Sequence, residues 1–208
     1  KCPYVPPHEW ALDFPHLMLR YRAARRKNGT LDTRAEPLTQ TDRNGQLARP
    51  IAPLANFAAR RDNWVTRPIL QAVVGIAADV ELPRYHTTTF SQRAALDPPR
   101  INAEGKARGR KAVVYATCFV DYNQPSTGAA ALAVLAQQGV ETEVVYPVCC
   151  GMPQLEQGNI EEVAHRAERV SAELLPYIDA GYDVVTLTAS CGLMFKFEWP
   201  LILPESEN

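Results

Sequence analysis

The sequence predicts an α/β fold, in which a parallel β-sheet is flanked by helices and preceded by a helical N-terminal segment. Beyond residue 110, three short runs rich in β-branched residues alternate with helical stretches. Before residue 110, the chain is rich in arginine and proline and has few strand signals. Strands that alternate with helices are typical of right-handed βαβ units, which build parallel sheets.

The alternating region carries clear boundary signals. Asn159, followed three residues later by Glu162, resembles a capping box at the start of a long helix. Pro176 is expected to loosen the last turn of that helix, and Gly181 to end it. The predicted strands cover 111–117, 141–146 and 183–188, and the predicted helices cover 127–138, 159–180 and 191–198, the last with Ser190 as its cap.

The N-terminal part is predicted to be helical. Asp13 can cap a helix over 14–27 whose apolar residues follow a period near 3.6. Two further helices are predicted over 51–59 and 67–77, and the proline- and glycine-containing stretch 83–110 is predicted to be a linker. The expected organisation is therefore a helical segment over 1–82, the linker, and an α/β domain over 111–208.

Composition excludes several classes of function. The 208 residues include 22 basic and 23 acidic side chains and have a net charge of −1, which offers no general field for nucleic acid. No apolar run approaches the roughly 20 residues that span a bilayer, so no transmembrane segment is predicted. The start, Lys1-Cys2-Pro3-Tyr4, lacks an initiator Met and a signal-peptide pattern. We expect a piece of a longer protein, or one processed at its front.

Four of the five cysteines follow predicted strands. Cys118 follows the first strand, Cys149 and Cys150 the second, and Cys191 the third. Ligands bind at the carboxyl edge of open parallel sheets, so the three loops are expected to converge there. An odd cysteine count without secretory features favours reduced thiols that bind metal or act in catalysis.

Convergent thiolates are soft ligands, which select iron–sulfur clusters, zinc or copper(I). Adjacent side chains diverge, so the pair Cys149-Cys150 suits a cluster with several irons better than one tetrahedral zinc ion. Gly151 lets the backbone come close without a side chain.

These residues resemble a known family. Cys118, a gap of thirty residues, Cys149-Cys150-Gly151-Met152-Pro153, and then Thr188-Ala189-Ser190-Cys191 are similar to the cysteine-rich CCG domain. That family occurs in iron–sulfur subunits of heterodisulfide reductase, glycolate oxidase and anaerobic glycerol-3-phosphate dehydrogenase. The resemblance implies that Cys118, Cys149, Cys150 and Cys191 bind an iron–sulfur cluster, with the [4Fe–4S] type expected.

This chain departs from the family at Thr188, where the family has the first cysteine of Cys-x-x-Cys. Four thiolates suffice for an ordinary four-iron cluster. The departure therefore favours simple electron transfer over disulfide cleavage.

The N-terminal residues extend the resemblance. Cys2 followed by Pro3 looks like the end of a ferredoxin motif, so Cys2 is a further, weaker candidate ligand. Residues 13–20 and 41–45 also look like a subfamily of heterodisulfide-reductase-related iron–sulfur proteins. On this interpretation, ferredoxin cysteines precede this chain in the whole protein, and a second CCG domain follows it.

The predicted function is electron transfer within a respiratory-type oxidoreductase, with no catalytic residue of its own. Electrons would come from a partner flavoprotein dehydrogenase or other redox subunit and pass to quinone or another carrier. The expected location is the cytoplasm, or the inner membrane periphery through partners. Two alternatives stay open: a zinc-bound or metal-free docking module, and a thiol–disulfide redox protein that uses Cys149 and Cys150.

Overall fold

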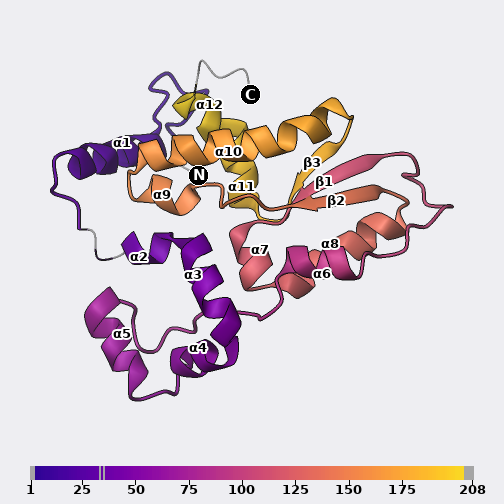
Figure 1. Ribbon diagram of the computed structural model, residues 1–208. Coiled ribbons are helices and arrows are strands. Elements are labelled where there is room, and N and C mark those ends of the chain that lie inside the picture. The colour runs from indigo at the N-terminus through magenta and orange to yellow at the C-terminus, as the bar shows by residue number, and fades with distance from the viewer. Residues whose placement is uncertain (1–2, 33, 35, 204–208) are drawn as a thin grey trace.

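The computed structural model describes residues 3–32, 34 and 36–203, and its architecture confirms the predicted α/β fold. Figure 1 shows a small sheet with helices on both faces, and a lobe of short helices set to one side of it. Cys2 lies outside the described residues. Within these ranges, no helix combines the length and the apolar character needed for a bilayer crossing.

The sheet has three parallel strands in the order β2-β1-β3. They are β1 (Lys111–Tyr115), β2 (Glu141–Val145) and β3 (Asp183–Thr186). In the register, Val113 of β1 lies opposite Glu143 of β2 and Val184 of β3. Because the strands are parallel, their carboxyl ends meet at one edge, as the sequence predicted.

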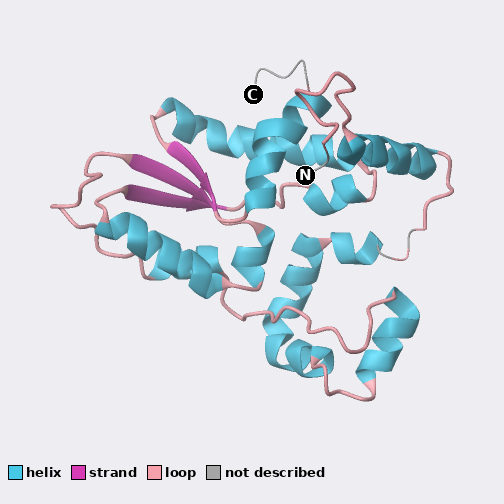
Figure 2. Cartoon of the chain, turned by 180° about the vertical axis from the view of Figure 1, so that it is seen from behind, coloured by secondary structure: helices cyan, strands magenta, loops and turns pink. Residues whose placement is uncertain are grey.

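Helices cover both faces of the sheet, as seen from behind in Figure 2. On one side lie α10 (Ile160–Asp179) and α12 (Trp199–Ile202), and on the other lie α6 (Phe90–Leu96) and α8 (Pro125–Gln137), whereas α1 (Phe14–Lys27) lies away from the strands at the left of Figure 1. Successive side chains of β1 alternate between two hydrophobic clusters, with Val113 and Tyr115 in one and Val114 in the other. The central strand is thus buried on both faces, which explains its uninterrupted apolar run.

The stretch predicted to be a linker contains a helix that the sequence analysis missed. Thr89 and Gln92 form a complete capping box at the start of α6. Phe90, at the first helical position, is fully buried against Gly128 of α8, where an added Cβ would lie 2.4 Å from its ring. The segment therefore wraps the sheet and contributes to its core.

The lobe consists of short helices in the N-terminal part of the chain. It contains α2 (Glu36–Thr39), α3 (Thr41–Ala48), the 3₁₀ turn η1 (Arg49–Ile51), α4 (Ala52–Ala59) and α5 (Thr66–Val74). The predicted helices over 51–59 and 67–77 correspond to α4 and α5, whereas α2 and α3 were not predicted. The helix over 14–27 agrees with α1, including its cap at Asp13.

Short helices also surround the carboxyl edge of the sheet. They are α7 (Cys118–Tyr122), α9 (Met152–Glu156), α11 (Ala189–Leu193) and the π-helix η2 (Met194–Glu198). The last helix predicted by sequence begins earlier than expected, because the backbone N–H of Cys191 donates to the carbonyl of Thr188. Thr188, not Ser190, therefore precedes the helix.

A histidine links the first helix to the C-terminal end of the fold. The ring of His16 contacts Asp13 and, at 3.1 Å, the carboxylate of Glu198. Hydrogen bonding to Asp13, and secondarily to Glu198, raises the pKa of His16 despite partial burial. A histidine whose pKa is raised by folding stabilises the fold fully below its unfolded pKa of about 6.5, and this stabilisation is lost as pH rises through the folded pKa.

We therefore expect part of the free energy of unfolding to decline as the pH rises from about 6.5 through the folded pKa of His16. His16→Gln should abolish that decline in chemical denaturation measured across this range. His165→Gln is the matched control, because His165 is exposed on α10. An unchanged pH profile in His16→Gln would contradict the assignment.

Candidate metal centre of four thiols

The four predicted side chains come together at the carboxyl edge of the sheet. The Sγ atoms of Cys149 and Cys118 are 3.5 Å apart, and those of Cys150 and Cys191 are 3.3 Å apart. Cys118 begins α7, the Cys149-Cys150 pair precedes α9, and Cys191 lies within α11. The convergence that the sequence predicted is present in the fold. That these thiols bind a metal stays a prediction.

Tight turns lead the chain into the helices that follow two of these loops. Thr117 precedes α7 with a φ of 54°, and its side chain accepts from the N–H of Val120. Gly151 precedes α9 with a φ of 90°, a conformation that favours glycine. An added Cβ at Gly151 would meet Val163 at 3.4 Å, so little space separates the turn from α10.

The site is deep inside the molecule. Cys149, Cys150 and Cys191 are at most 3% exposed, and Cys118 is half-buried. The indole N–H of Trp199 donates to the carbonyl of Cys150 over 3.1 Å. The phenol of Tyr115 donates to the carbonyl of Val148 over 2.5 Å. Hydrogen bonds from two buried aromatic residues thus fix the backbone on either side of Cys149.

The lobe supplies a carboxylate that sequence reasoning missed. Asp42, on α3, accepts from the backbone N–H of Cys149 over 3.1 Å and from Nη1 of Arg166 over 2.7 Å. The hydroxyl of Tyr146 donates to its other oxygen. The only signal in the sequence was the family likeness over 41–45, which carries no role for a particular side chain.

The pKa values of three of the thiols are shifted, and not all in the same direction. Hydrogen bonding with the sulfurs of Cys118 and Cys150 holds the pKa of Cys149 below the ordinary thiol range. Hydrogen bonding to Cys149 first, and burial next, holds the pKa of Cys118 above that range. The pKa of Cys150 is raised by its contacts with Cys149 and Cys191 and by burial. Metal binding deprotonates thiols, so a bound cation would overcome this sharing of protons.

The donor set fits a thiolate-ligated cluster. Four convergent thiols match the ligand count of a four-iron cluster. The buried hydroxyl of Thr41 lies near Cys118 and Cys149 and has no hydrogen-bond partner among the described residues. It is available to donate to a sulfur ligand.

In the described ranges, no group of three or more His, Cys, Asp and Glu side chains is arranged as a metal-ion site. The sulfurs instead form two pairs. Thr188, which stands at the fourth of the five cysteine positions of the resemblance, lies with its hydroxyl 3.1 Å from that of Thr117.

Comparison with known proteins agrees with the motif. Residues 112–196 match the model of a family described as a cysteine-rich domain, CCG. The subunit designated B of fumarate reductase (CoM/CoB) from Methanothermobacter marburgensis is 34% identical over 48% of this chain and 20% of its own length. The subunit designated C of anaerobic glycerol-3-phosphate dehydrogenase from Escherichia coli is 26% identical over 80% of this chain and 41% of its own length.

A third relative is lactate utilization protein A of Bacillus pumilus, 35% identical over 46% of this chain and 38% of its own length. The chain thus spans less than half the length of each of these curated relatives. No solved structure matches significantly.

Proposed function

Because residues 112–196 are a cysteine-rich CCG domain, we propose that this chain is an electron-transfer component of a larger oxidoreductase. Cys118, Cys149, Cys150 and Cys191 would hold an iron–sulfur cluster of the [4Fe–4S] type. The observation that carries the proposal is the meeting of four thiols from three loops in one buried place. When bound, such a cluster supplies reversible one-electron chemistry, and the protein supplies ligation, burial and hydrogen bonds.

The relatives support a role with redox partners, because two of them are named as parts of a reductase and of a dehydrogenase. We propose that a flavoprotein dehydrogenase or other redox subunit delivers electrons, and that quinone or another carrier receives them. The chain would then act in the cytoplasm or at the inner membrane periphery, held there by its partners. The domain organisation proposed from the sequence, with a helical segment over 1–82 and the cysteine-rich domain over 111–208, fits this role.

A redox titration tests the electron-transfer role. Protein prepared without oxygen should show a visible absorption band that bleaches on addition of a reductant and returns on reoxidation, through several cycles. An apo sample of the same protein, stripped with a chelator, is the control and should show no band. An iron-loaded sample whose absorption does not respond to reductant would contradict electron transfer while leaving metal binding intact.

The spacing of the sulfurs favours a second candidate, a thiol–disulfide redox protein. The close pairs are Cys149 with Cys118 and Cys150 with Cys191, rather than the adjacent residues that the sequence suggested. Oxidation of one pair would form one S–S bond and release two protons and two electrons to a disulfide oxidant. This activity requires an accessible thiol, whereas three of these four cysteines are buried.

Thiol titration separates the two candidates. The cluster role predicts slow labelling of all four thiols in iron-loaded protein. One cysteine that reacts rapidly in iron-free protein, followed by loss of two thiols after treatment with oxidised glutathione, would favour the disulfide role.

A further inference from the structure

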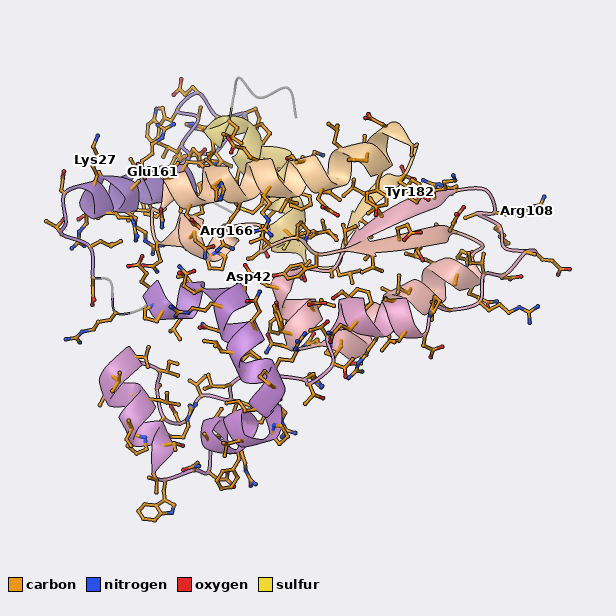
Figure 3. The ribbon with its side chains drawn as sticks, viewed as in Figure 1. Lys27, Asp42, Arg108, Glu161, Arg166 and Tyr182 are labelled. Atoms are coloured by element: carbon orange, nitrogen blue, oxygen red, sulfur yellow. The ribbon has the colours of Figure 1, made fainter. Side chains whose placement is uncertain are left out.

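Two helices far apart in the sequence meet beside the thiols. Asp42 lies on α3 of the lobe and Arg166 on α10 of the cysteine-rich domain, 124 positions later. Figure 3 shows the two labelled side chains in the region where the lobe approaches α10. Their ion pair of 2.7 Å is shielded from solvent, with the Arg166 and Asp42 side chains 7% and 15% exposed.

Both carboxylate oxygens of Asp42 accept hydrogen bonds from residues around the site. One oxygen receives both the N–H of Cys149 and the guanidinium of Arg166, and the other receives the hydroxyl of Tyr146. Burial keeps Tyr146 protonated by raising its pKa well above the ordinary value, so its hydroxyl remains a donor. The carboxylate therefore ties the cysteine loop, the end of β2 and α10 to one point.

The guanidinium of Arg166 also contacts a second carboxylate, that of Glu162. Its Nε donates to the carboxylate of Glu162, one helical turn earlier, over 2.8 Å. Burial works against its charge, but the hydrogen bonds to Asp42 and Glu162 raise its pKa, and the nearby Cys149 sulfur adds to this. A fixed positive charge is therefore placed near the thiols.

The position of α3 is set by close packing. Gly45 lies one turn after Asp42 and is buried against the ring of Tyr122 on α7, where an added Cβ would lie 2.5 Å away. Nε2 of Gln154, on α9, donates to the carbonyl of Thr39 over 2.6 Å. Contacts with α7 and α9 thus hold residues 39–45 beside the site.

We propose that Asp42 and Arg166 are positioning residues of the thiol site, which fix the Cys149 loop and set the reduction potential of the group bound there. The inference rests on the proposed function. Asp42 places a negative charge and Arg166 a positive charge beside the ligands in a buried environment, where screening is weak. Reduction adds an electron to the bound group. The negative charge of Asp42 therefore lowers the reduction potential, and the positive charge of Arg166 raises it.

The test uses the chain loaded with iron and sulfide without oxygen, and compares reduction potentials. Asp42→Asn keeps an acceptor for the Cys149 N–H and removes a negative charge, so the potential should rise. Arg166→Gln removes the positive charge, so the potential should fall. Arg166→Lys keeps the charge and should lie close to the wild type.

The exposed pair of Arg22 and Glu156 supplies matched controls. Their side chains are 43% and 48% exposed, with an N–O distance of 2.5 Å. Glu156→Gln and Arg22→Gln make the same changes of charge as the two test variants, but water and salt screen them. Neither control should shift the potential measurably.

Shifts of opposite sign in Asp42→Asn and Arg166→Gln would support the proposal, because a role in folding alone would move neither potential in a charge-dependent way. Shifts in the same direction, or shifts no larger than those of the controls, would overturn it. A wild-type chain that binds no cluster would instead overturn the proposed function, so the two failures are distinguishable.

Discussion

Replacing Cys150 with serine should remove bound iron from the protein. Cys150 is 2% exposed, and its Sγ lies 3.3 Å from that of Cys191, so its loss breaks the set of four thiols. A serine hydroxyl is similar in size but is a hard and weakly acidic ligand, poorly suited to iron–sulfur clusters. Iron content should fall from about four per chain to nearly none, with loss of the visible absorption.

The measurement is iron and acid-labile sulfide in anaerobically reconstituted protein, with circular dichroism to establish that the fold persists. Cys2→Ser tests the further candidate ligand in the same assay and should keep its iron, because the four thiols at the sheet edge suffice for a four-iron cluster. Full iron occupancy and an unchanged spectrum in Cys150→Ser would contradict the assignment of Cys150 as a ligand.

Replacing Arg67 with methionine should unfold the outer part of the lobe. Arg67 is 1% exposed and donates to the carbonyls of Ala77, Ala78 and Val80 over 2.6–3.0 Å. Methionine has a similar length but no donors, so these backbone carbonyls lose charged partners. Hydrogen bonds to charged groups contribute about 1.5–3 kcal/mol each, so a loss of roughly 3 kcal/mol or more is expected.

Hydrogen exchange locates the effect, because amides of α4 and α5 should lose protection while those of α8 and α10 keep it. Arg61→Met is the control, since Arg61 is exposed. Equal exchange rates in the two variants would show that the buried guanidinium does not organise the lobe.

The elements predicted well from the sequence are those whose own residues determine them. The central strand β1 is apolar throughout its last four residues because both of its faces are buried, and α10 runs for 20 residues with one buried face. The five-residue helices α7 and α9 are too short to show a period. Tertiary contacts stabilise such short helices. In α3, for example, Gly45 disfavours a helix in the sequence, but it allows the ring of Tyr122 to pack closely against the helix.

The candidate site likewise has residues whose positions the sequence predicts and one whose contribution it does not. The positions of Cys118, Cys149 and Cys191 after three strands were enough to predict their convergence, because parallel strands end at one edge. The contribution of Asp42 could not be predicted in this way. It depends on how the lobe packs against α7 and α9, and a pairing between Asp42 and Arg166 leaves no local pattern in the sequence.

The metal and sulfide content of the wild-type chain, prepared without oxygen, tests the central claim most directly. The four-thiol site should contain iron and acid-labile sulfide at about four of each per chain, with little zinc. Zinc at about one per chain, or no metal together with four free thiols at the site, would contradict the cluster and favour a docking module or a thiol–disulfide protein.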